Sequence, residues 1–174
     1  MQKTYLCIDL KSFYASVECV ELGLDPFKVN LVVADPTRGG GAITLAATPA
    51  IKKLGVSSRG RIFEIDPKIE YMITPPRMHL YMEYSCKVYK VFLEFIAKED
   101  IHVYSIDESF LDVTSYLKLY QVNAKELAKK MLDRIYEKTG LTATVGIGTN
   151  LYLAKIAMDI SAKHNDNRIA YLNE

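Results

Sequence analysis

The chain lacks the features that mark secreted, membrane-spanning and disulfide-bonded proteins. Its 174 residues include three cysteines, Cys7, Cys19 and Cys86. Their odd number argues against a disulfide framework, and their spacing matches no metal-binding pattern. No apolar run approaches the length of a membrane-spanning helix, and the first residues lack the apolar core of a signal peptide. The sequence therefore predicts a reduced, cytoplasmic protein with no membrane partner.

An excess of positive charge is also missing. The chain has 22 Lys and Arg residues against 21 Asp and Glu residues, which leaves a net charge of +1. A protein that holds DNA by itself is usually much more basic. If this chain binds DNA, most of the binding contacts are expected to come from residues outside this chain. Its hydrophobic content of 49% and its length predict one globular domain, or one domain with a small insertion.

Hydrophobic periodicity and turn residues predict alternating short strands and helices. Strands are expected at 4–8, 31–33, 42–47, 71–73, 101–106, 109–113, 142–147 and 168–172. Helices are expected at 11–22, 48–55, 78–96, 123–138 and 150–162. In the long helix that starts at Met78, the residues expected on the buried face are Met78, Tyr81, Met82, Ser85, Val88, Tyr89, Phe92, Phe95 and Ile96.

Without residues 23–76, the remaining elements follow the split βαβ, ferredoxin-like order of an α+β fold. The predicted domains are therefore a core of residues 1–22 and 77–174 and a small α/β insertion of residues 23–76.

Acidic residues stand at the ends of two predicted strands. Asp9 ends the first strand, and Asp107 and Glu108 follow the strand at 101–106. In a ferredoxin-like sheet these strands are neighbours, so the acids are expected to lie close together. Buried carboxylates need compensation, and a divalent metal compensates several at once. Two simpler interpretations exist: Asp9 caps a helix, or the second pair belongs to a polar turn, although that turn lacks glycine and asparagine.

Four motifs in order resemble those of the Y-family, or translesion, DNA polymerases. They are Asp9–Glu18 (DLKSFYASVE), Ala47–Val56 (ATPAIKKLGV), Ser105–Asp112 (SIDESFLD) and Val145–Ala157 (VGIGTNLYLAKIA). The resemblance covers nearly the whole chain and is closest to the UV-damage-repair branch, which includes the catalytic subunit of bacterial DNA polymerase V. It implies a catalytic palm with a fingers insertion and the template-directed transfer of nucleotides to DNA.

The resemblance also implies roles for the acids. Asp9, Asp107 and Glu108 match the three metal-binding residues, which hold two magnesium ions in the family. The backbone carbonyl of Leu10 matches a further metal ligand. Together these residues would carry out two-metal nucleotidyl transfer.

A second group matches the residues that bind the incoming nucleotide. The backbone amides of Ser12 and Phe13 match groups that receive the triphosphate, and Tyr14 matches the aromatic steric gate that excludes a sugar 2′-hydroxyl. Lys52 matches the fingers cation that meets the phosphates. Pro49 stands where many family members carry a phosphate-contacting tyrosine, so that contact is not expected here.

The remaining matches concern a cation and the nascent base pair. Lys163 matches the cation near the end of the palm, although the preceding stretch is one residue longer than is usual in the family. Ile43 and Leu45 match the roof over the base pair, and their alternation also fits an ordinary half-buried strand. Lys155 is expected to be structural or near DNA.

The family's thumb and little-finger domains are absent from this chain, which therefore resembles a palm and fingers fragment of low activity. Implied partners are primer-template DNA, deoxynucleoside triphosphates and, through a missing C-terminal region, a sliding clamp and accessory repair proteins. Two other functions remain open. A nucleotide cyclase uses a similar palm with carboxylate-bound metals, and a non-catalytic relative could act as a repair scaffold.

Overall fold

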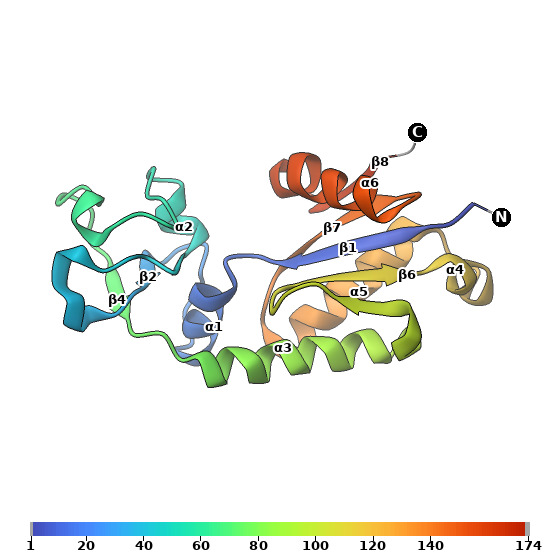
Figure 1. Ribbon diagram of the computed structural model, residues 1–174, viewed down its shortest axis with the longest axis horizontal. Coiled ribbons are helices and arrows are strands. Elements are labelled where there is room, and N and C mark those ends of the chain that lie inside the picture. Colours follow the sequence, from blue (N-terminus) through green and yellow to red (C-terminus); the bar gives the residue numbers. More distant parts are fainter. Residues whose placement is uncertain (1, 173–174) are drawn as a thin grey trace. The chain divides into compact units, whose positions relative to one another are not determined.

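The computed structural model describes residues 2–172 and divides the chain into two compact units (Figure 1). Unit 1 consists of Met1–Leu10 and Ser85–Glu174, and unit 2 of Lys11–Tyr84. The boundary falls within one helix, α3 (Met78–Leu93). Unit 2 thus includes residues 11–22 and 77–84 beside the predicted insertion, and the assignment of palm and fingers stays a prediction.

Unit 1 is built on a five-stranded sheet in the order β5-β6-β1-β7-β8. Its strands are β1 (Tyr5–Leu10), β5 (Ile101–Val103), β6 (Glu108–Asp112), β7 (Ala143–Gly148) and β8 (Ile169–Leu172). The central strand β1 pairs antiparallel with both β6 and β7, and β8 joins β7 in parallel. The first four strands reproduce the ferredoxin-like order, so the predicted α+β fold is confirmed.

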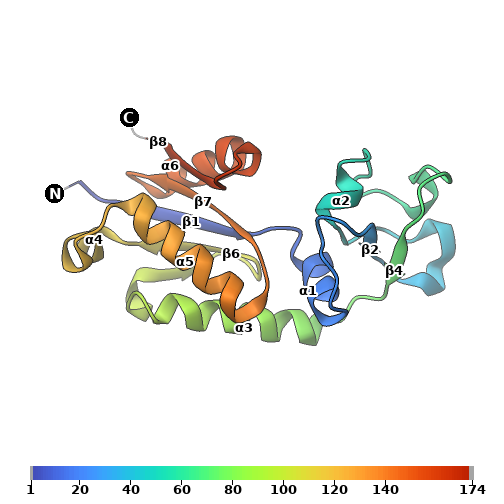
Figure 2. The same ribbon diagram turned by 180° about the vertical axis from the view of Figure 1, so that it is seen from behind.

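Helices cover both faces of this sheet. The helix α5 (Ala124–Thr139) crosses the face turned to the viewer in Figure 2. It begins at a capping box in which Asn123 and Glu126 each bond the other's backbone N–H, and it ends at Gly140 in the left-handed conformation. On the other face, the α6 helix (Leu151–Ile156) packs against β7 and β1.

Side chains alternate between these two faces along each strand. Cys7 and Phe110 are cross-strand partners and form a buried cluster with Ala154 and Met158, which follow β7. The two glycines of β7 face the same helical segment. Residues that are two positions from Cys7 therefore point toward α6, and Asp9 is one of them.

The predicted last helix is not a single α-helix. After α6, the chain makes a π-helical turn at Ala157–Ser161 and a 3-10 turn at Ala162–His164. A π turn accommodates one extra residue within a helix. This π turn immediately precedes the 3-10 turn that carries Lys163.

Unit 2 contains a three-stranded sheet in the order β3-β2-β4. Its elements are α1 (Phe13–Glu21), β2 (Leu31–Val33), β3 (Ala46–Ala47), α2 (Pro49–Lys52), β4 (Met72–Thr74) and 3-10 turns at Pro36–Gly41 and Ile62–Glu64. The strand β2 pairs antiparallel with β3 and parallel with β4. The buried side chains of Val32, Ala47, Ile51 and Ile65 form the core of this unit.

Some sequence predictions of elements were wrong. No element was expected between residues 113 and 123, yet Thr114–Tyr120 forms the helix α4, and Lys98–Asp100 forms a 3-10 turn before β5. The strand predicted at 42–47 contracts to two residues, with an isolated bridge at Ile43. Met78 and Met82, which were expected on the buried face of α3, are 46% and 54% exposed. Methionine fits the apolar pattern but is also tolerated in solvent.

Thr48 lies at the N-cap position of α2, as the sequence predicts, but its side chain does not cap the helix. Its hydroxyl donates a hydrogen bond to the Val29 carbonyl at 2.7 Å and accepts one from the Leu31 amide at 3.1 Å. Thr48 is fully buried. The hydroxyl therefore ties the start of β2 to the strand end that precedes α2.

Replacing Thr48 with valine should destabilise the protein. The change keeps the shape of the side chain but leaves the buried Leu31 N–H without that acceptor, which costs about 1–3 kcal/mol. Urea unfolding followed by circular dichroism would measure the loss. The matched Thr37→Val variant removes an exposed hydroxyl that bonds Asp35, and it should change stability by less than about 0.5 kcal/mol. Equal effects of the two variants would contradict the structural role of Thr48.

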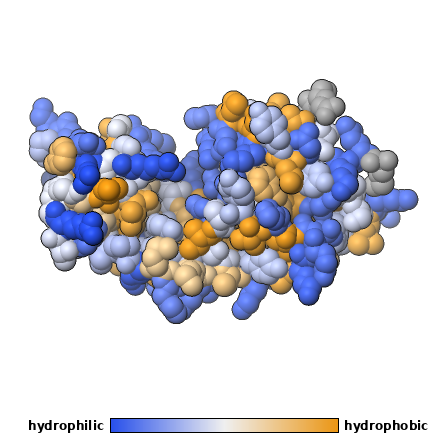
Figure 3. All heavy atoms as spheres, viewed as in Figure 1, coloured by the Kyte–Doolittle hydropathy of each residue, from blue (hydrophilic) through white to orange (hydrophobic). Residues whose placement is uncertain are grey.

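No helix within residues 2–172 is long and apolar enough to cross a membrane. Hydrophilic side chains cover much of the face seen in Figure 3, with apolar side chains in small groups between them.

Candidate active site

The predicted acids lie at one end of two neighbouring interior strands of the sheet in unit 1, β1 and β6. Asp9 near the end of β1 is the direct cross-strand partner of Glu108 at the start of β6. The amide of Leu10 donates a 2.9 Å hydrogen bond to the carbonyl of Asp107, which closes the pairing at this end. Directly opposed residues point to the same face of a sheet. The two strands are neighbours, as the sequence predicted, and the side chains of Asp9 and Glu108 both face α6.

Two lysines from the segment after β7 neutralise part of this acidic charge. Lys155 Nζ lies 2.5 Å from Glu108 Oε1, and Lys163 Nζ lies 3.2 Å from Asp9 Oδ2. Asp159 lies between the two lysines along the helix and contacts both, at 3.4 Å and 2.9 Å. The spacing of four residues places all three on one helix face, so each lysine has two carboxylate partners. The spacing is visible in the sequence, but it does not by itself show that this helix face covers the acids.

The environment shifts the pKa values of these groups. Burial raises the pKa of Asp9 to about 6, and the charges of Asp107 and Glu108 push it in the same direction while Lys163 opposes them. Burial lowers the pKa of Lys155, but the hydrogen bond and charge of Glu108 outweigh this effect and raise it. Burial and the adjacent Glu108 raise the pKa of the Cys7 thiol, which donates a hydrogen bond to that carboxylate at 3.3 Å.

The charges and oxygen atoms of this site can be compared with those that a divalent metal requires. Three carboxylates, those of Asp9, Glu108 and Asp159, contact two ammonium groups, so negative charge is in excess, and magnesium prefers oxygen ligands. Burial is the main cause of the raised pKa of Asp9, and the neighbouring carboxylates Asp107 and Glu108 add to it. Within the described residues 2–172, no three acidic, histidine or cysteine side chains converge closely enough to form a metal site as they stand. The carboxylate oxygens are ligands that suit a divalent cation. In this structure the ammonium groups of Lys155 and Lys163 pair with these carboxylates.

Replacing Lys163 with methionine should raise the pKa of Asp9 further. Lys163 is the opposing positive charge, so its loss disfavours the carboxylate and moves the pKa above about 6. A carboxyl-carbon NMR titration of the metal-free protein would measure this shift. The Lys129→Met variant removes an exposed lysine that pairs with Asp133, and it should leave the Asp9 titration in place. An unchanged Asp9 pKa in Lys163→Met would contradict the ion pair.

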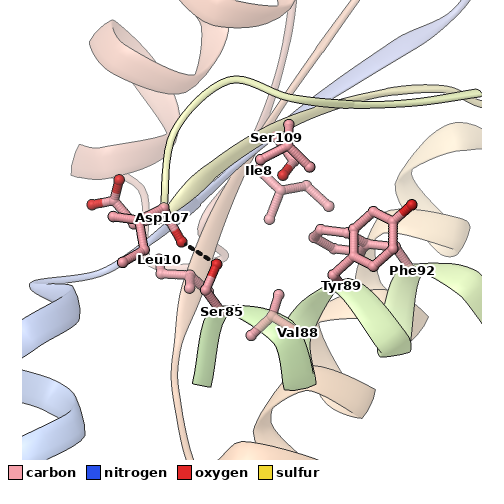
Figure 4. A pocket seen from close by; sticks show the side chains of 10 residues that line it. Ile8, Leu10, Ser85, Val88, Tyr89, Phe92, Asp107 and Ser109 are labelled. Carbon is pink, nitrogen blue, oxygen red and sulfur yellow. Dashed lines mark hydrogen bonds between the residues drawn. The ribbon is translucent and has the colours of Figure 1, made fainter. Parts of the chain in front are cut away.

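The loop that presents Asp107 is tied to α3. Ser85 Oγ donates a 2.6 Å hydrogen bond to the carbonyl of Ile106, the residue before Asp107 (Figure 4). A small apolar cavity beside this bond is lined by Ile8, Val88 and Phe92 among others. The serine therefore fixes the backbone at the point where β6 begins. The helical periodicity of the sequence places Ser85 on the buried face of α3 but does not indicate this bond.

In unit 2, two of the predicted nucleotide-binding residues contact each other. Ser12 stands at the N-cap of α1 but does not cap it, and its backbone adopts the left-handed conformation with φ 48° and ψ 49°. Its hydroxyl accepts a 2.9 Å hydrogen bond from Lys52 Nζ. A left-handed conformation is unfavourable for a residue other than glycine, and such strain is found preferentially at functional sites. Phe13 begins the helix, with its side chain buried.

Tyr14 is held from one side by a second tyrosine. Its ring stacks on that of Tyr81 with centroids 4.3 Å apart and an interplanar angle of 12°. Tyr81 is fully buried, and its hydroxyl donates a 2.6 Å hydrogen bond to Glu18. The sequence gives no signal for this Glu18 contact, because its partners Arg77 and Tyr81 lie about sixty positions away.

The predicted roof residues are exposed, as that role requires. Ile43 and Leu45 are 47% and 48% exposed, whereas Thr44 between them is buried. Pro49 is buried at the first position of α2.

The chain is similar in sequence to a known protein family. Residues 8–159 match the model of the impB/mucB/samB family. The chain belongs to this family. Over 172 residues it is 41% identical to the putative UV-damage repair protein UvrX of Bacillus subtilis, covering 97% of this chain and 39% of that protein. Over 177 residues it is 38% identical to DNA polymerase IV 2 of the same organism, covering 99% of this chain and 41% of that protein.

Solved structures show the same fold. DinB from Sulfolobus solfataricus superimposes with a TM-score of 0.79 at 28% identity, covering 98% of this chain and 48% of DinB. A Y-family DNA polymerase chimera of Dbh and Dpo4 gives a TM-score of 0.80 at 29% identity, with the same coverage. The predicted membership of the Y family is confirmed. The chain spans roughly two-fifths of the length of the two curated relatives named above.

Proposed function

We propose that this chain forms the catalytic palm and fingers of a translesion DNA polymerase. The palm comprises residues 1–22 and 77–174, and the fingers residues 23–76. The observation that carries the proposal is the pairing of Asp9 and Glu108 on one sheet face, with Asp107 beside them and two lysines opposite. Family membership and the likeness to solved polymerases support it.

Asp9, Asp107 and Glu108 would hold two magnesium ions, assisted by the backbone carbonyl of Leu10. Ions held there would supply positive charge that offsets the charge developing in the reaction and makes the primer hydroxyl more acidic. The chain's own contribution is a rigid base: adjacent strands fix the acids, and the Ser85 bond fixes the loop at Ile106. Lys155 and Lys163 balance the acids before binding, and Asp159 gives both ammonium groups an alternative partner.

Residues of unit 2 bind the nucleotide. The amides of Ser12 and Phe13 at the start of α1 receive phosphate oxygens, because backbone donors point outward at a helix N-terminus. Lys52, already next to Ser12, adds positive charge for the phosphates. Tyr14 lies beneath the sugar and rejects a 2′-hydroxyl.

Lys163 gives a further positive charge for the triphosphate, and the exposed Ile43 and Leu45 cover the nascent base pair. The partners are primer-template DNA and deoxynucleoside triphosphates in the cytoplasm, with a sliding clamp and accessory repair proteins as partners of longer forms.

Primer extension with magnesium and deoxynucleotides tests the proposal. The assay compares this chain with a fusion in which it replaces the matching part of DNA polymerase IV 2 of B. subtilis. We expect the fusion to extend primers and the chain alone to do so poorly. Failure of the fusion, with folding verified by circular dichroism, would overturn the proposal. A cyclic product from nucleotide alone would indicate a cyclase instead.

A further inference from the structure

We propose that Glu18, Arg77 and Tyr81 form a positioning cluster that fixes the ring of Tyr14 and thereby sets how strictly ribonucleotides are rejected. The inference rests on the proposed function, in which Tyr14 contacts the sugar. All four residues belong to unit 2, so the cluster is complete within one compact body.

The cluster starts from the stack between two tyrosines. Tyr14 is partly exposed, whereas Tyr81 beneath it is fully buried, with nearly parallel rings. Phe13 packs edge-on against Tyr81, with ring centroids 6.3 Å apart. The face of Tyr81 therefore determines the plane in which the ring of Tyr14 rests.

The orientation of Tyr81 depends on Glu18. The tyrosine hydroxyl donates to Glu18 Oε1 at 2.6 Å, and Arg77 donates to both carboxylate oxygens at 3.0 Å and 2.5 Å. The Glu18 side chain is only 3% exposed, while that of Arg77 is 48% exposed. A buried carboxylate needs such partners to remain charged, and the two-pronged contact with arginine fixes its orientation. Burial and Glu18 also raise the pKa of the Tyr81 hydroxyl, so it remains a donor.

This arrangement exceeds what packing of two helices requires. An apolar pair would join α1 and α3 without the desolvation of a carboxylate. The charged network instead restricts rotation of one ring, and that ring supports the residue assigned to sugar selection. A ring with a fixed plane can exclude one additional hydroxyl, whereas a ring that shifts leaves room for it.

The same two helices provide a matched control one turn further on. Tyr84 on α3 donates a 2.6 Å hydrogen bond to Glu21 on α1, and each of these residues is three positions beyond its counterpart in the cluster. Substitutions in this second pair remove the same kind of bond between the same helices. They leave Glu18, Arg77 and Tyr81 in place.

The first experiment measures sugar selection in the fusion. The ratio of kcat/KM for a deoxynucleotide to that for the matching ribonucleotide should fall about ten-fold in Glu18→Gln, within the range of coupling between neighbouring residues. Tyr81→Phe, which removes a single hydroxyl, should lower the ratio in the same direction. Glu21→Gln and Tyr84→Phe should keep the parent ratio. Equal ratios in all four variants, or equal losses, would overturn the inference.

A second measurement separates this inference from the proposed function. In this chain without DNA, the aromatic NMR signals of Tyr14 report its stacking on Tyr81. Glu18→Gln and Tyr81→Phe should shift those signals, and the two control variants should not. Unshifted Tyr14 signals in a folded Glu18→Gln protein would contradict the positioning cluster even if the fusion is an active polymerase. A fusion without activity but with the expected shifts would overturn the proposed function alone.

Discussion

Replacing Asp107 with alanine should abolish primer extension by the fusion while leaving the fold intact. The side chain is partly exposed, and its hydrogen-bond partner is the nearby Ser105 hydroxyl at 2.9 Å. The bond that closes the sheet at this point uses the backbone carbonyl of Asp107, which the substitution retains. Loss of one metal-binding carboxylate from a site that works by preorganised charge should reduce the rate about a thousand-fold.

Single-nucleotide incorporation and circular dichroism would be measured on the same preparation. Asp112→Asn is a suitable control because Asp112 ends the same strand, β6, and accepts hydrogen bonds from the amide and hydroxyl of Thr114. It should lose some stability and keep its activity. Incorporation at the parent rate by a folded Asp107→Ala fusion would remove this residue from the proposed catalytic set.

The sequence was sufficient to place the acids on neighbouring strands. Asp9 ends a short apolar strand, and the motifs of Asp9 and Asp107 are two of the four motifs whose order together indicates the family. Their exact pairing could not be predicted, because a shift of one residue in register would turn Glu108 to the other face. The observed register, Asp9 opposite Glu108, brings both toward α6.

The partners of these acids could not be predicted from local patterns. A lysine on a helix is usually a solvated charge, so Lys155 and Lys163 are ambiguous until the helix is placed over the sheet. The π turn at Ala157–Ser161 adds to the difficulty, because it changes the face on which later residues appear. In the same way, the burial of Glu18 depends on Arg77, which is distant in sequence.

The glycines of β7 belong to a recognised motif, yet only the structure shows why they are needed. A methyl group at Gly146 would lie 2.0 Å from the Ala154 carbonyl oxygen and 2.3 Å from the Met158 amide. Both are backbone atoms of the helical segment that covers this face. The backbone of Gly146 is not in the left-handed region, so the requirement comes from close packing between strand and helix.

Replacing Gly146 with alanine should therefore destabilise unit 1 strongly. Because backbone cannot move aside as a flexible side chain does, we expect a loss of about 3 kcal/mol or more, measured by urea unfolding. The control is Gly41→Ala, since a methyl group there has no neighbour within 4 Å and the residue is not at positive φ. It should change stability by less than about 1 kcal/mol.

The same substitution should also disturb the candidate active site. Any relief of the overlap moves the segment from Ala154 to Met158 away from the sheet, and this segment carries Lys155. The distance between the Lys155 ammonium and Glu108 would increase, and the carboxylate would lose its neutralising partner. A Gly146→Ala protein that folds as stably as Gly41→Ala would contradict the close packing on which this positioning depends.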